Sequence, residues 1–453
     1  MKPCRRVIRD AARGRPRAVL PVGLITSALL TLLACGGDGS GGSVSTPTPT
    51  PVASATPQPT PTIADAFTIA DGLLGPVAVQ AAAGGDRYLV TFSVPVAAGG
   101  SEVAGARLDA NGTVLDDPPL ALSDLGDAPF LAPGATYFPG GIAWATSGFG
   151  AFLVGYGNVA AGPPGQIVGF VGVPASGPPA LPATAIDEQM TFSMAQTSLA
   201  GPVAASSNGT LFLGAYQEIV SLVGSFSVRR VIGQIVTNPP VAAQEIGPFS
   251  GIAPPPDGLI TSGSAPGVAT RDDGATLLAW VEVVAPETMP SDTTMRVQGV
   301  VLTEAASTPV TLAATETGAD GVAVASDGTS FLVVWATPGQ AEPPATGELR
   351  AVRYAPGGEP QPGGGFVVAT GATAKDLVGV VFAGGSWLVA WIEGTVLRGA
   401  LIGATDTIEP IELDPGPVAS AALASDGARV LVVLDRPGSD GSSDVLGRFV
   451  TVD

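Results

Sequence analysis

A short apolar phrase returns seven times along this chain, and no other feature constrains the fold as strongly. Each copy follows a turn that contains glycine, often Asp-Gly, and ends in an aromatic or large aliphatic residue. The copies are Tyr88–Phe92, Phe152–Tyr156, Phe212–Tyr216, Thr276–Trp280, Phe331–Trp335, Trp387–Trp391 and Val430–Leu434. Their last residues are 64, 60, 64, 55, 56 and 43 positions apart, and a recurring unit of this length predicts a repeat architecture.

The first unit divides into four strands when its turn residues are marked. Gly84-Gly85 closes a first hairpin and Asn111-Gly112 a later one. The second strand of the unit is the apolar phrase, and its lack of polar residues is typical of a strand covered on both faces. The abundance of glycine (62) and proline (43) also favours short strands and turns over long helices.

The two ends of the repeat region complement each other. Phe67–Ala70 resembles the last strand of a unit, while the chain finishes with Val445–Val450, which resembles a third strand. We therefore expect an all-β fold, a seven-bladed β-propeller with four-stranded blades, in which an N-terminal strand completes the last blade.

By its residues, the repeat resembles those of secreted bacterial proteins of the propeller type. Asp327–Trp335 is the best copy of their pattern Asp-Gly-x-x-aromatic-Leu-Val-Val-Trp, and the resemblance covers about residues 65–453. Such repeats are common in lipoproteins and large surface proteins of Gram-negative bacteria. The resemblance implies a fold but no activity, because propellers serve as enzymes, lectins and scaffolds alike.

The N-terminus has the features of an export signal. A basic region, residues 1–17, precedes an apolar stretch, Ala18–Ala34, which ends Leu32-Leu33-Ala34-Cys35. This ending resembles the lipobox of bacterial lipoproteins, which implies that residues 1–34 are a signal peptide and that Cys35 carries lipid. An ordinary secretory signal or a single membrane anchor stays open, although the apolar stretch is short for a span. Gly36 after the cysteine resembles the pattern for sorting to the outer membrane.

Residues 35–63 read as a linker, rich first in Gly and Ser and then in Thr-Pro pairs such as Thr46–Pro51. Proline-rich chain favours the extended polyproline II conformation, so this segment predicts a tether between the lipid and the propeller, residues 64–453. Sugars on its threonines, or a partner domain that recognises proline, remain alternatives.

Charge limits the partners. Removing residues 1–34 takes seven basic and one acidic residue from totals of 20 and 39, which leaves a net charge near −25. A chain this acidic disfavours nucleic acid and anionic lipid as partners. Membrane attachment would therefore depend on acyl chains.

Histidine is absent from the sequence, and the only cysteines are Cys4 and Cys35. This excludes Ser-His-Asp and Cys-His nucleophilic systems, imidazole metal sites and disulfides in the repeat region. No glycine-rich phosphate loop precedes a helix pattern, and we expect no cofactor.

Paired carboxylates remain possible as a catalytic system, because glycosidases need only two acids at the right separation. The pairs that could serve are Asp116-Asp117, Asp187-Glu188 and Asp272-Asp273. A sialidase would need a tyrosine nucleophile, for which the repeat leaves Tyr137 and Tyr354. Ser326–Thr329 lacks the spacing of the sialidase Asp-box. The densest acidic loop, Asp435–Asp444, is a weak candidate for calcium, and we expect no metal site.

Most other notable residues have structural interpretations. Trp280, Trp335 and Trp391 share one repeat position and are expected in the core, with Trp387 also packed. Many arginines fall on third strands, where pairing with acids of neighbouring strands is expected: Arg107, Arg229, Arg230, Arg296, Arg350, Arg353, Arg398 and Arg448.

The sequence thus favours a lipid-anchored envelope protein that presents a propeller as a binding or scaffolding module for a protein or glycan. Its long loops, 125–140, 180–200, 240–265 and 282–294, would form the recognition face. The alternative is a glycan hydrolase with acids in a central funnel. A structural role in envelope assembly also stays open.

Overall fold

The computed structural model describes a set of ranges, all within one compact unit, Pro57–Asp453. They are residues 61–95, 101–122, 136–145, 151–159, 167–176, 180–188, 195–199, 204–222, 226–236, 243–246, 259–263, 266–286, 294–303, 307–316, 320–337, 347–355, 359–360 and 365–452. The predicted signal peptide, Cys35 and nearly all of the predicted tether lie outside these ranges.

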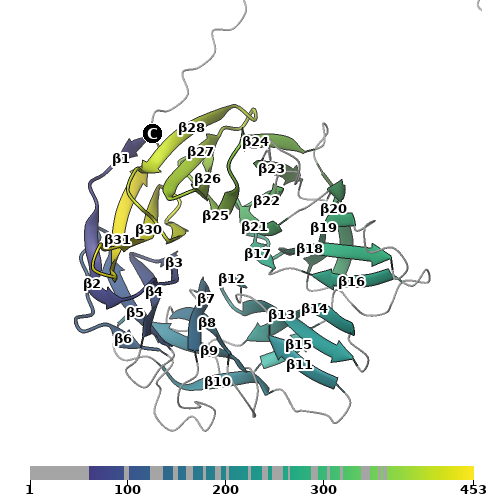
Figure 1. Ribbon diagram of the computed structural model, residues 1–453, viewed down its shortest axis with the longest axis horizontal. Coiled ribbons are helices and arrows are strands. Elements are labelled where there is room, and N and C mark those ends of the chain that lie inside the picture. Colours follow the sequence, from purple (N-terminus) through teal and green to yellow (C-terminus); the bar gives the residue numbers. More distant parts are fainter. Residues whose placement is uncertain are drawn as a thin grey trace, which may run out of the picture. The chain divides into compact units, whose positions relative to one another are not determined.

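The described chain is all β (Figure 1). Its regular structure consists of strands, and across the described ranges none is assigned as a helix. Consistent with that, none of these residues forms a helix of the length and apolarity that a membrane crossing requires. The all-β prediction is confirmed.

Hydrogen bonds join the strands into six sheets, whose order follows the chain. The eight-stranded sheet contains β3 (Val79–Gly84), β4 (Arg87–Pro95), β5 (Ser101–Asp109), β6 (Leu120–Ala121), β7 (Thr136–Ala145), β8 (Ala151–Val159), β9 (Ile167–Pro174) and β10 (Ala180–Glu188). Two five-stranded sheets contain β11 (Ala195–Leu199), β12 (Ala204–Ser207), β13 (Phe212–Leu222), β14 (Phe226–Val236) and β15 (Ala243–Ile246), then β16 (Leu259–Gly263), β17 (Gly267–Thr270), β18 (Thr276–Pro286), β19 (Thr294–Leu302) and β20 (Ser307–Glu316).

The remaining sheets come from the C-terminal part of the chain and have four, four and five strands. They contain β21 (Asp320–Ser326), β22 (Phe331–Thr337), β23 (Gly347–Tyr354) and β24 (Phe366–Gly371), then β25 (Lys375–Ala383), β26 (Ser386–Glu393), β27 (Val396–Ile402) and β28 (Ile408–Asp414). The last has β29 (Ser420–Ser425), β30 (Arg429–Pro437) and β31 (Ser442–Thr451) together with β1 (Thr62–Ile63) and β2 (Phe67–Leu74).

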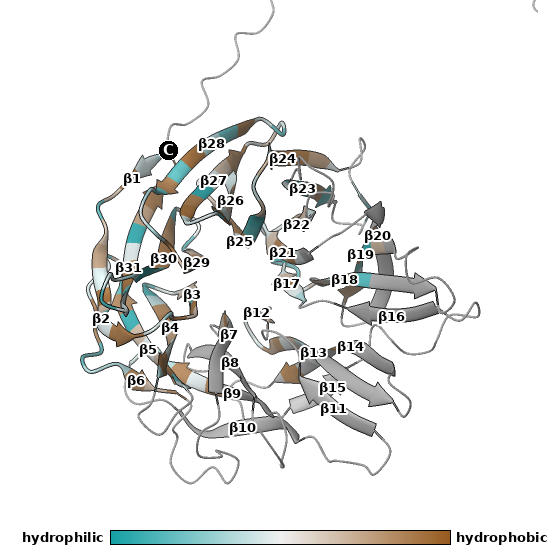
Figure 2. Cartoon of the chain, in the orientation of Figure 1, coloured by the Kyte–Doolittle hydropathy of each residue, from teal (hydrophilic) through white to brown (hydrophobic). Residues whose placement is uncertain are grey.

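The apolar phrase occupies the same place in every repeat. Its copies lie on β4, β8, β13, β18, β22, β26 and β30, each between a first strand on one side and a third strand on the other. The burial of β30 and β31 shows why. Val430–Asp435 is buried at every position, whereas buried and partly exposed residues alternate along most of β31. The apolar run therefore forms a strand covered on both faces, and the alternating one a strand with a wetter face (Figure 2).

The hydrophobic core lies between neighbouring sheets. One cluster joins β21–β24 to β25–β28 and includes Leu332 and Val334 of β22 with Val389 and Trp391 of β26. Others join β25–β28 to β29–β31, and β17–β19 to β21–β23. Each first strand also contacts the first strand of the next repeat, in the order β3, β7, β12, β17, β21, β25, β29, and β29 contacts β3.

The described strands form six sheets, whereas the sequence predicts seven separate four-stranded units. Two sets of four strands, β3–β6 and β7–β10, share one sheet because β5 and β7 are joined by a single parallel pair, Ser101 with Thr136. The other strand pairs are antiparallel and join strands that follow each other in the chain, except for β11 with β13, β16 with β18, and β1 and β2 with β31.

The two ends of the described chain form one sheet, as predicted from Phe67–Ala70. β2 runs antiparallel to β31, with Phe67 opposite Gly447, and β1 continues the pairing with Thr62 opposite Thr451. Phe67 stacks on Phe449, and Val77 donates its backbone N–H to the buried Asp435 at 2.9 Å. The pairing starts within the segment that the sequence assigns to the linker.

Candidate functional site

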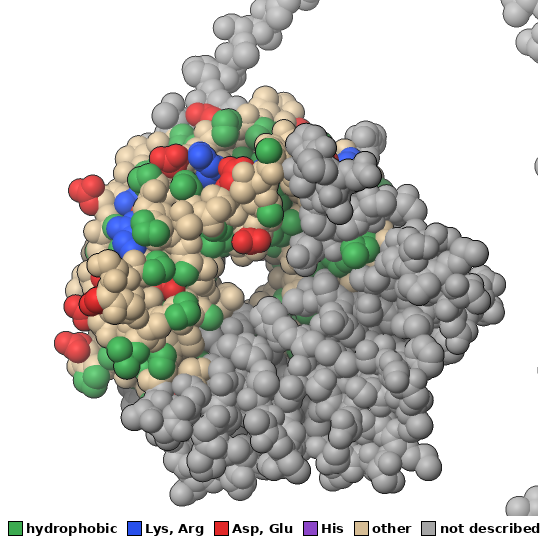
Figure 3. All heavy atoms as spheres, in the orientation of Figure 1, with side chains coloured by type: hydrophobic (Ala, Val, Ile, Leu, Met, Phe, Trp, Pro, Cys, Tyr) green, Lys and Arg blue, Asp and Glu red, His purple; other side chains and the backbone are tan. Residues whose placement is uncertain are grey.

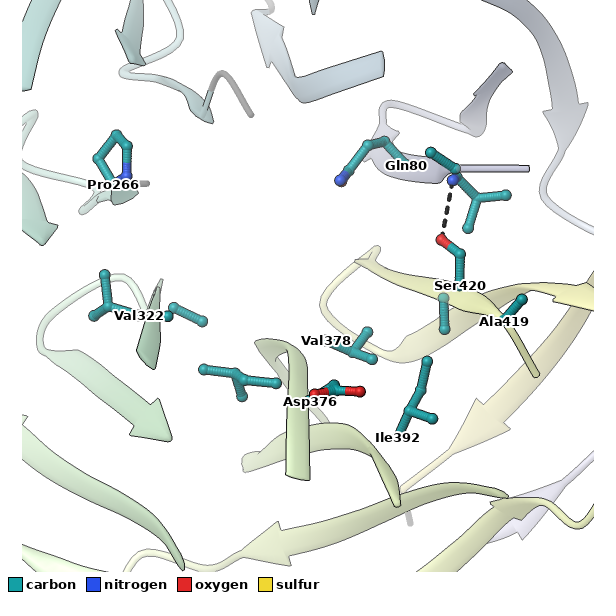
Figure 4. Close-up of a pocket in the computed structure, with 14 residues that line it drawn as sticks. Gln80, Pro266, Val322, Asp376, Val378, Ile392, Ala419 and Ser420 are labelled. Atoms are coloured by element: carbon teal, nitrogen blue, oxygen red, sulfur yellow. Dashed lines mark hydrogen bonds between the residues drawn. The ribbon is translucent and has the colours of Figure 1, made fainter. Parts of the chain in front are cut away.

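A cavity of about 450 Å³ opens where several first strands meet. It is lined from β3, β21, β25, β26 and β29, and from Pro266 just before β17 (Figure 4). In the space-filling view the described surface beside the opening is mainly hydrophobic and neutral, with an acidic side chain at its rim (Figure 3). This cavity is the candidate site, because pockets at the meeting point of repeats bring several chain segments together.

Asp376 is the charged residue among the described residues that line the cavity. It is exposed, lies on β25 opposite Ile392 of β26, and is labelled at the cavity in Figure 4. The preceding Lys375 belongs to the other face of the strand, since successive side chains alternate. Its side chain is 1% exposed, and its Nζ lies 3.1 Å from Glu393 Oε1 and 3.2 Å from the Thr373 carbonyl oxygen.

Two uncharged polar residues, Gln80 and Ser420, also line the cavity. Gln80 of β3 extends its amide toward the open space in Figure 4. Ser420 of β29 accepts a hydrogen bond from the backbone N–H of Val79 through its Oγ at 3.2 Å, so its own O–H is still available to donate. The rest of the lining is apolar or glycine: Ala78, Val79, Pro266, Gly321, Val322, Ala323, Leu377, Val378, Ile392, Ala419 and Ala421.

The acid pairs named from the sequence lie elsewhere. The side chain of Asp116 is 8% exposed and binds Arg107, with Oδ1 2.6 Å from Nη2 and Oδ2 2.8 Å from Nε. Burial opposes ionisation of Asp116, but the hydrogen bonds from Arg107 outweigh it and hold its pKa below the usual value. Asp273 binds Arg271 at 2.7 Å in the β17–β18 turn. Asp187 and Glu188 lie on β10, and their side chains are not among those described.

The acidic segment Asp435–Asp444 also acts as structure. Asp444 Oδ1 accepts the N–H of Gly72 at 3.0 Å, and Asp440 Oδ1 accepts the N–H of Ser442 at 3.0 Å. Asp435 is fully buried, and this burial raises its pKa. Among the described residues, no group of three or more potential metal ligands comes together.

Of the two tyrosines left as nucleophile candidates, Tyr354 is buried in the cluster of β17–β19 with β21–β23. Burial raises the pKa of Tyr354, so its phenolate is disfavoured, contrary to what a nucleophile needs. The side chain of Tyr137 is outside the described part. Trp280, Trp335, Trp387 and Trp391 are all buried, as predicted.

Arginines on the third strands pair with acids, as expected, where their side chains are described. Arg296 binds Glu282 of the adjacent β18 at 2.6 Å. Two others reach the neighbouring sheet: Arg353 binds Asp406 at 2.6 Å, and Arg448 lies 3.2 Å from the fully buried Asp414. The Arg353–Asp406 and Arg448–Asp414 pairs therefore connect neighbouring sheets. The side chains of Arg229 and Arg230 lie outside the described part.

The Asp-Gly turns also connect sheets. Asp327 Oδ1 accepts the N–H groups of Thr329 and Ser330, and Asp426 Oδ1 accepts those of Ala428 and Arg429. The glycine carbonyl of each turn accepts a bond from the preceding sheet, Asp272 N–H to Gly328 and Gly384 N–H to Gly427, both at 3.0 Å. The motif thus closes its own hairpin and fastens it to a neighbour.

The predicted recognition loops are partly wrong. Strands β10, β11, β15 and β16 and parts of β7 and β18 occupy these stretches, and the remaining positions lie outside the described residues. The physical reason is that β13 and β18 continue past the apolar phrase, and the extensions pair with β11 and β16. Turn residues alone do not reveal such an extension.

Asp376 was not among the sequence candidates. Its signal is an acid near the start of a first strand that is apolar from Leu377 onward, at the position that Ser420 occupies in the next repeat: Asp376 lies opposite Ile392 and Ser420 opposite Asp435, each directly after the apolar phrase. A single acid in one copy of a repeat carries no pattern of its own, so only the packing of first strands around the cavity identifies it.

Comparison with known proteins gives likenesses of fold. Neither a family model nor a curated protein matches the chain. The chain is similar to the crystal structure of polysaccharide lyase Uly1, with a TM-score of 0.52 and 10% identity over 83% of this chain and 90% of that one. Weaker likenesses include Trypanosoma rangeli sialidase, with a TM-score of 0.44 and 8% identity over 83% of this chain and 55% of that one. Another is a protein of unknown function from Dyadobacter fermentans DSM 18053, with a TM-score of 0.44 and 11% identity over 86% and 99%. At such identities the likeness supports a β-propeller-like all-β fold alone.

Proposed function

We propose that the chain is a closed seven-bladed β-propeller, held at the bacterial envelope by lipid on Cys35, and that it serves as a binding or scaffolding module. Two observations support closure. The first strands contact one another in succession and β29 contacts β3, and β2 completes the sheet of β29–β31. In this proposal β3–β6 and β7–β10 are separate blades that touch through one pair of residues.

The proposed anchor comes from the sequence. The basic and apolar segments before Cys35 fit an export signal, and the Gly-rich and Thr-Pro segments fit a tether. We place the protein at the outer membrane on the basis of Gly36. Lipid then supplies the membrane attachment that the acidic chain does not.

The observation that carries the module proposal is that several described acids have structural roles. Asp116, Asp414 and Asp426 are bound to arginines or backbone groups that join strands and sheets. The cavity offers Asp376 among its described lining, together with small and apolar side chains. That lining suits the binding of a ligand, whereas glycoside hydrolysis needs a second acid about 5 to 10 Å away.

The proposal is tested with the full-length protein expressed in a bacterial host that lipidates its own lipoproteins. An alkyne fatty acid fed to the cells should label the wild type and not Cys35→Ser, and only the wild type should stay with the membrane fraction. Photo-crosslinking on the cell surface, followed by reconstitution with the purified partner, should give saturable binding of a protein or glycan.

A panel of polysaccharides and glycosides serves as the counter-test. Turnover that co-purifies with the wild type and is lost in Asp376→Asn would replace the module by the glycan-acting enzyme. Equal labelling of Cys35→Ser would refute the anchor.

A further inference from the structure

We propose that the cavity binds an organic ammonium ion, whose charged nitrogen pairs with Asp376 and whose apolar body lies against the surrounding side chains. The inference rests on the proposed binding module and names the chemistry of one of its ligands.

Charge comes first. Asp376 is exposed to the cavity, and neither a hydrogen bond nor an ion pair of its side chain is found within the described part of the chain. The basic residue beside it in sequence, Lys375, is buried on the opposite face and bound to Glu393, which also receives Arg398 Nε at 2.9 Å. An incoming cation therefore meets a carboxylate whose nearest cation along the strand is already neutralised, in a chain with a net charge of −19.

The surroundings of the carboxylate set the rest of the ligand. Val322, Val378 and Ile392 come from three different strands. Val378 and Ile392 lie beside Asp376 in Figure 4, Val322 lies farther to the left, and Ala419 lies on the Ser420 side. Apolar walls lower the local dielectric, which strengthens the attraction of Asp376 for a cation and favours a ligand with hydrocarbon to bury. A cavity of about 450 Å³ holds a ligand with several carbon atoms.

The polar groups opposite are compatible with the same ligand. The free O–H of Ser420 and the amide of Gln80 can bind a hydroxyl, carbonyl or second amine on its far end. A carboxylate ligand such as a uronate would instead face the charge of Asp376. A divalent metal ion would find one carboxylate in the described lining, where it prefers six or more oxygen ligands.

The test is a titration of the full-length protein, extracted from the membrane in neutral detergent, with hexylammonium chloride by calorimetry. We expect saturable binding that weakens with added salt, and no binding of hexanoate. Asp376→Asn should weaken hexylammonium binding by about tenfold or more, which corresponds to one lost charge pair in a partly desolvated site. Asp376→Glu should restore part of it.

The matched control is Asp71→Asn, which removes the same charge from an exposed position on the outer strand β2 and should leave binding unchanged. Thermal unfolding of all variants checks that they are folded. A blocked peptide, acetyl-Ala-Val-Lys-Val-Ala-amide, separates the two sources of an ammonium group. Binding of the peptide alone assigns the site to a lysine of a partner, and binding of hexylammonium alone assigns it to a free amine.

Absence of binding by both probes, or binding that Asp376→Asn leaves intact, would overturn the inference. Such a result leaves the module itself standing if the crosslinked envelope partner still binds. Conversely, amine binding without any envelope partner would leave the cation site in place and remove the scaffolding role.

Discussion

At the residue scale, Gly328 and Gly427 occupy the same place in two Asp-Gly turns and differ in their surroundings. Their φ angles are 91° and 90°, a region that side chains rarely adopt. A Cβ on Gly328 would lie 2.6 Å from Asp272 Oδ2 of the preceding sheet, while a Cβ on Gly427 would meet nothing within 4 Å. At Gly328 a side chain is therefore opposed both by the positive φ and by contact with the preceding sheet, whereas at Gly427 it is opposed by the positive φ alone.

We expect Gly427→Ala to lower the free energy of unfolding by about 1 to 2 kcal/mol, the cost of a left-handed conformation with a side chain. Gly328→Ala should cost more, because Asp272 must move as well. Denaturant midpoints of the two variants measure the difference, and equal losses would show that Asp272 yields freely.

At this scale the sequence predicted structural residues better than the site. Buried tryptophans and paired arginines repeat from unit to unit, so a pattern reveals them. Asp376 occurs in one repeat, and which acid pairs with Arg107 depends on contacts that the periodicity does not encode. Asp116 was named as a candidate acid, yet its partner is a structural arginine.

At the scale of elements, β2 is attached to β31 by both backbone and side chains. Phe67 stacks on Phe449 with ring centroids 5.8 Å apart, and Phe449 in turn lies beside Tyr88 and under the guanidinium of Arg429. The strand thus covers a cluster made by both ends of the described chain.

Phe67→Ala should lower the free energy of unfolding by about 2 kcal/mol, less than for a fully buried phenylalanine because Phe67 is partly exposed. Thr68→Ala, an exposed position on the same strand, is the control and should stay within about 0.5 kcal/mol of the wild type. Unfolding curves test the pair. A loss as large in the control would mean that backbone pairing, and not the aromatic stack, holds β2.

Elements were predictable wherever one repeat resembles another. The strands that carry the apolar phrase, and the N-terminal strand β2, lie where turns and periodicity place them. β11 and β16 were missed because they pair with the extensions of β13 and β18 past the apolar phrase, which turn residues do not reveal.

At the scale of the whole molecule, Asp435 connects parts of the chain 358 residues apart, through the N–H of Val77. Burial raises the pKa of Asp435, so its contribution to stability is full below the pKa of an unfolded aspartate and is lost as pH rises through the folded value. The side chain of Arg271 lowers the pKa of Asp273, and the contribution of Asp273 has the opposite sign: it is present at higher pH and lost as pH falls.

We therefore expect the stability of Asp435→Asn relative to the wild type to rise as pH increases above about 4. The stability of Asp273→Asn relative to the wild type should fall as pH increases through the range below about 5, so measurements from about pH 2 to about pH 7 cover both changes. Melting temperatures recorded across this range give the pH dependence of each variant. A pH-independent effect of the amide shifts a whole curve and does not alter its slope. Parallel curves for the two variants would contradict the assignment.

The pairing of β1 and β2 with β31 has a mechanical consequence. Any pull transmitted through the residues before Thr62 reaches the fold at the Thr62–Thr451 pair, and then at Phe67–Gly447, before it reaches any other sheet. The strand that completes the last sheet is thus the first to bear tension. A load strong enough to peel it away would expose the edge of β31 and the aromatic cluster beneath, while the hairpins of the other sheets stayed paired.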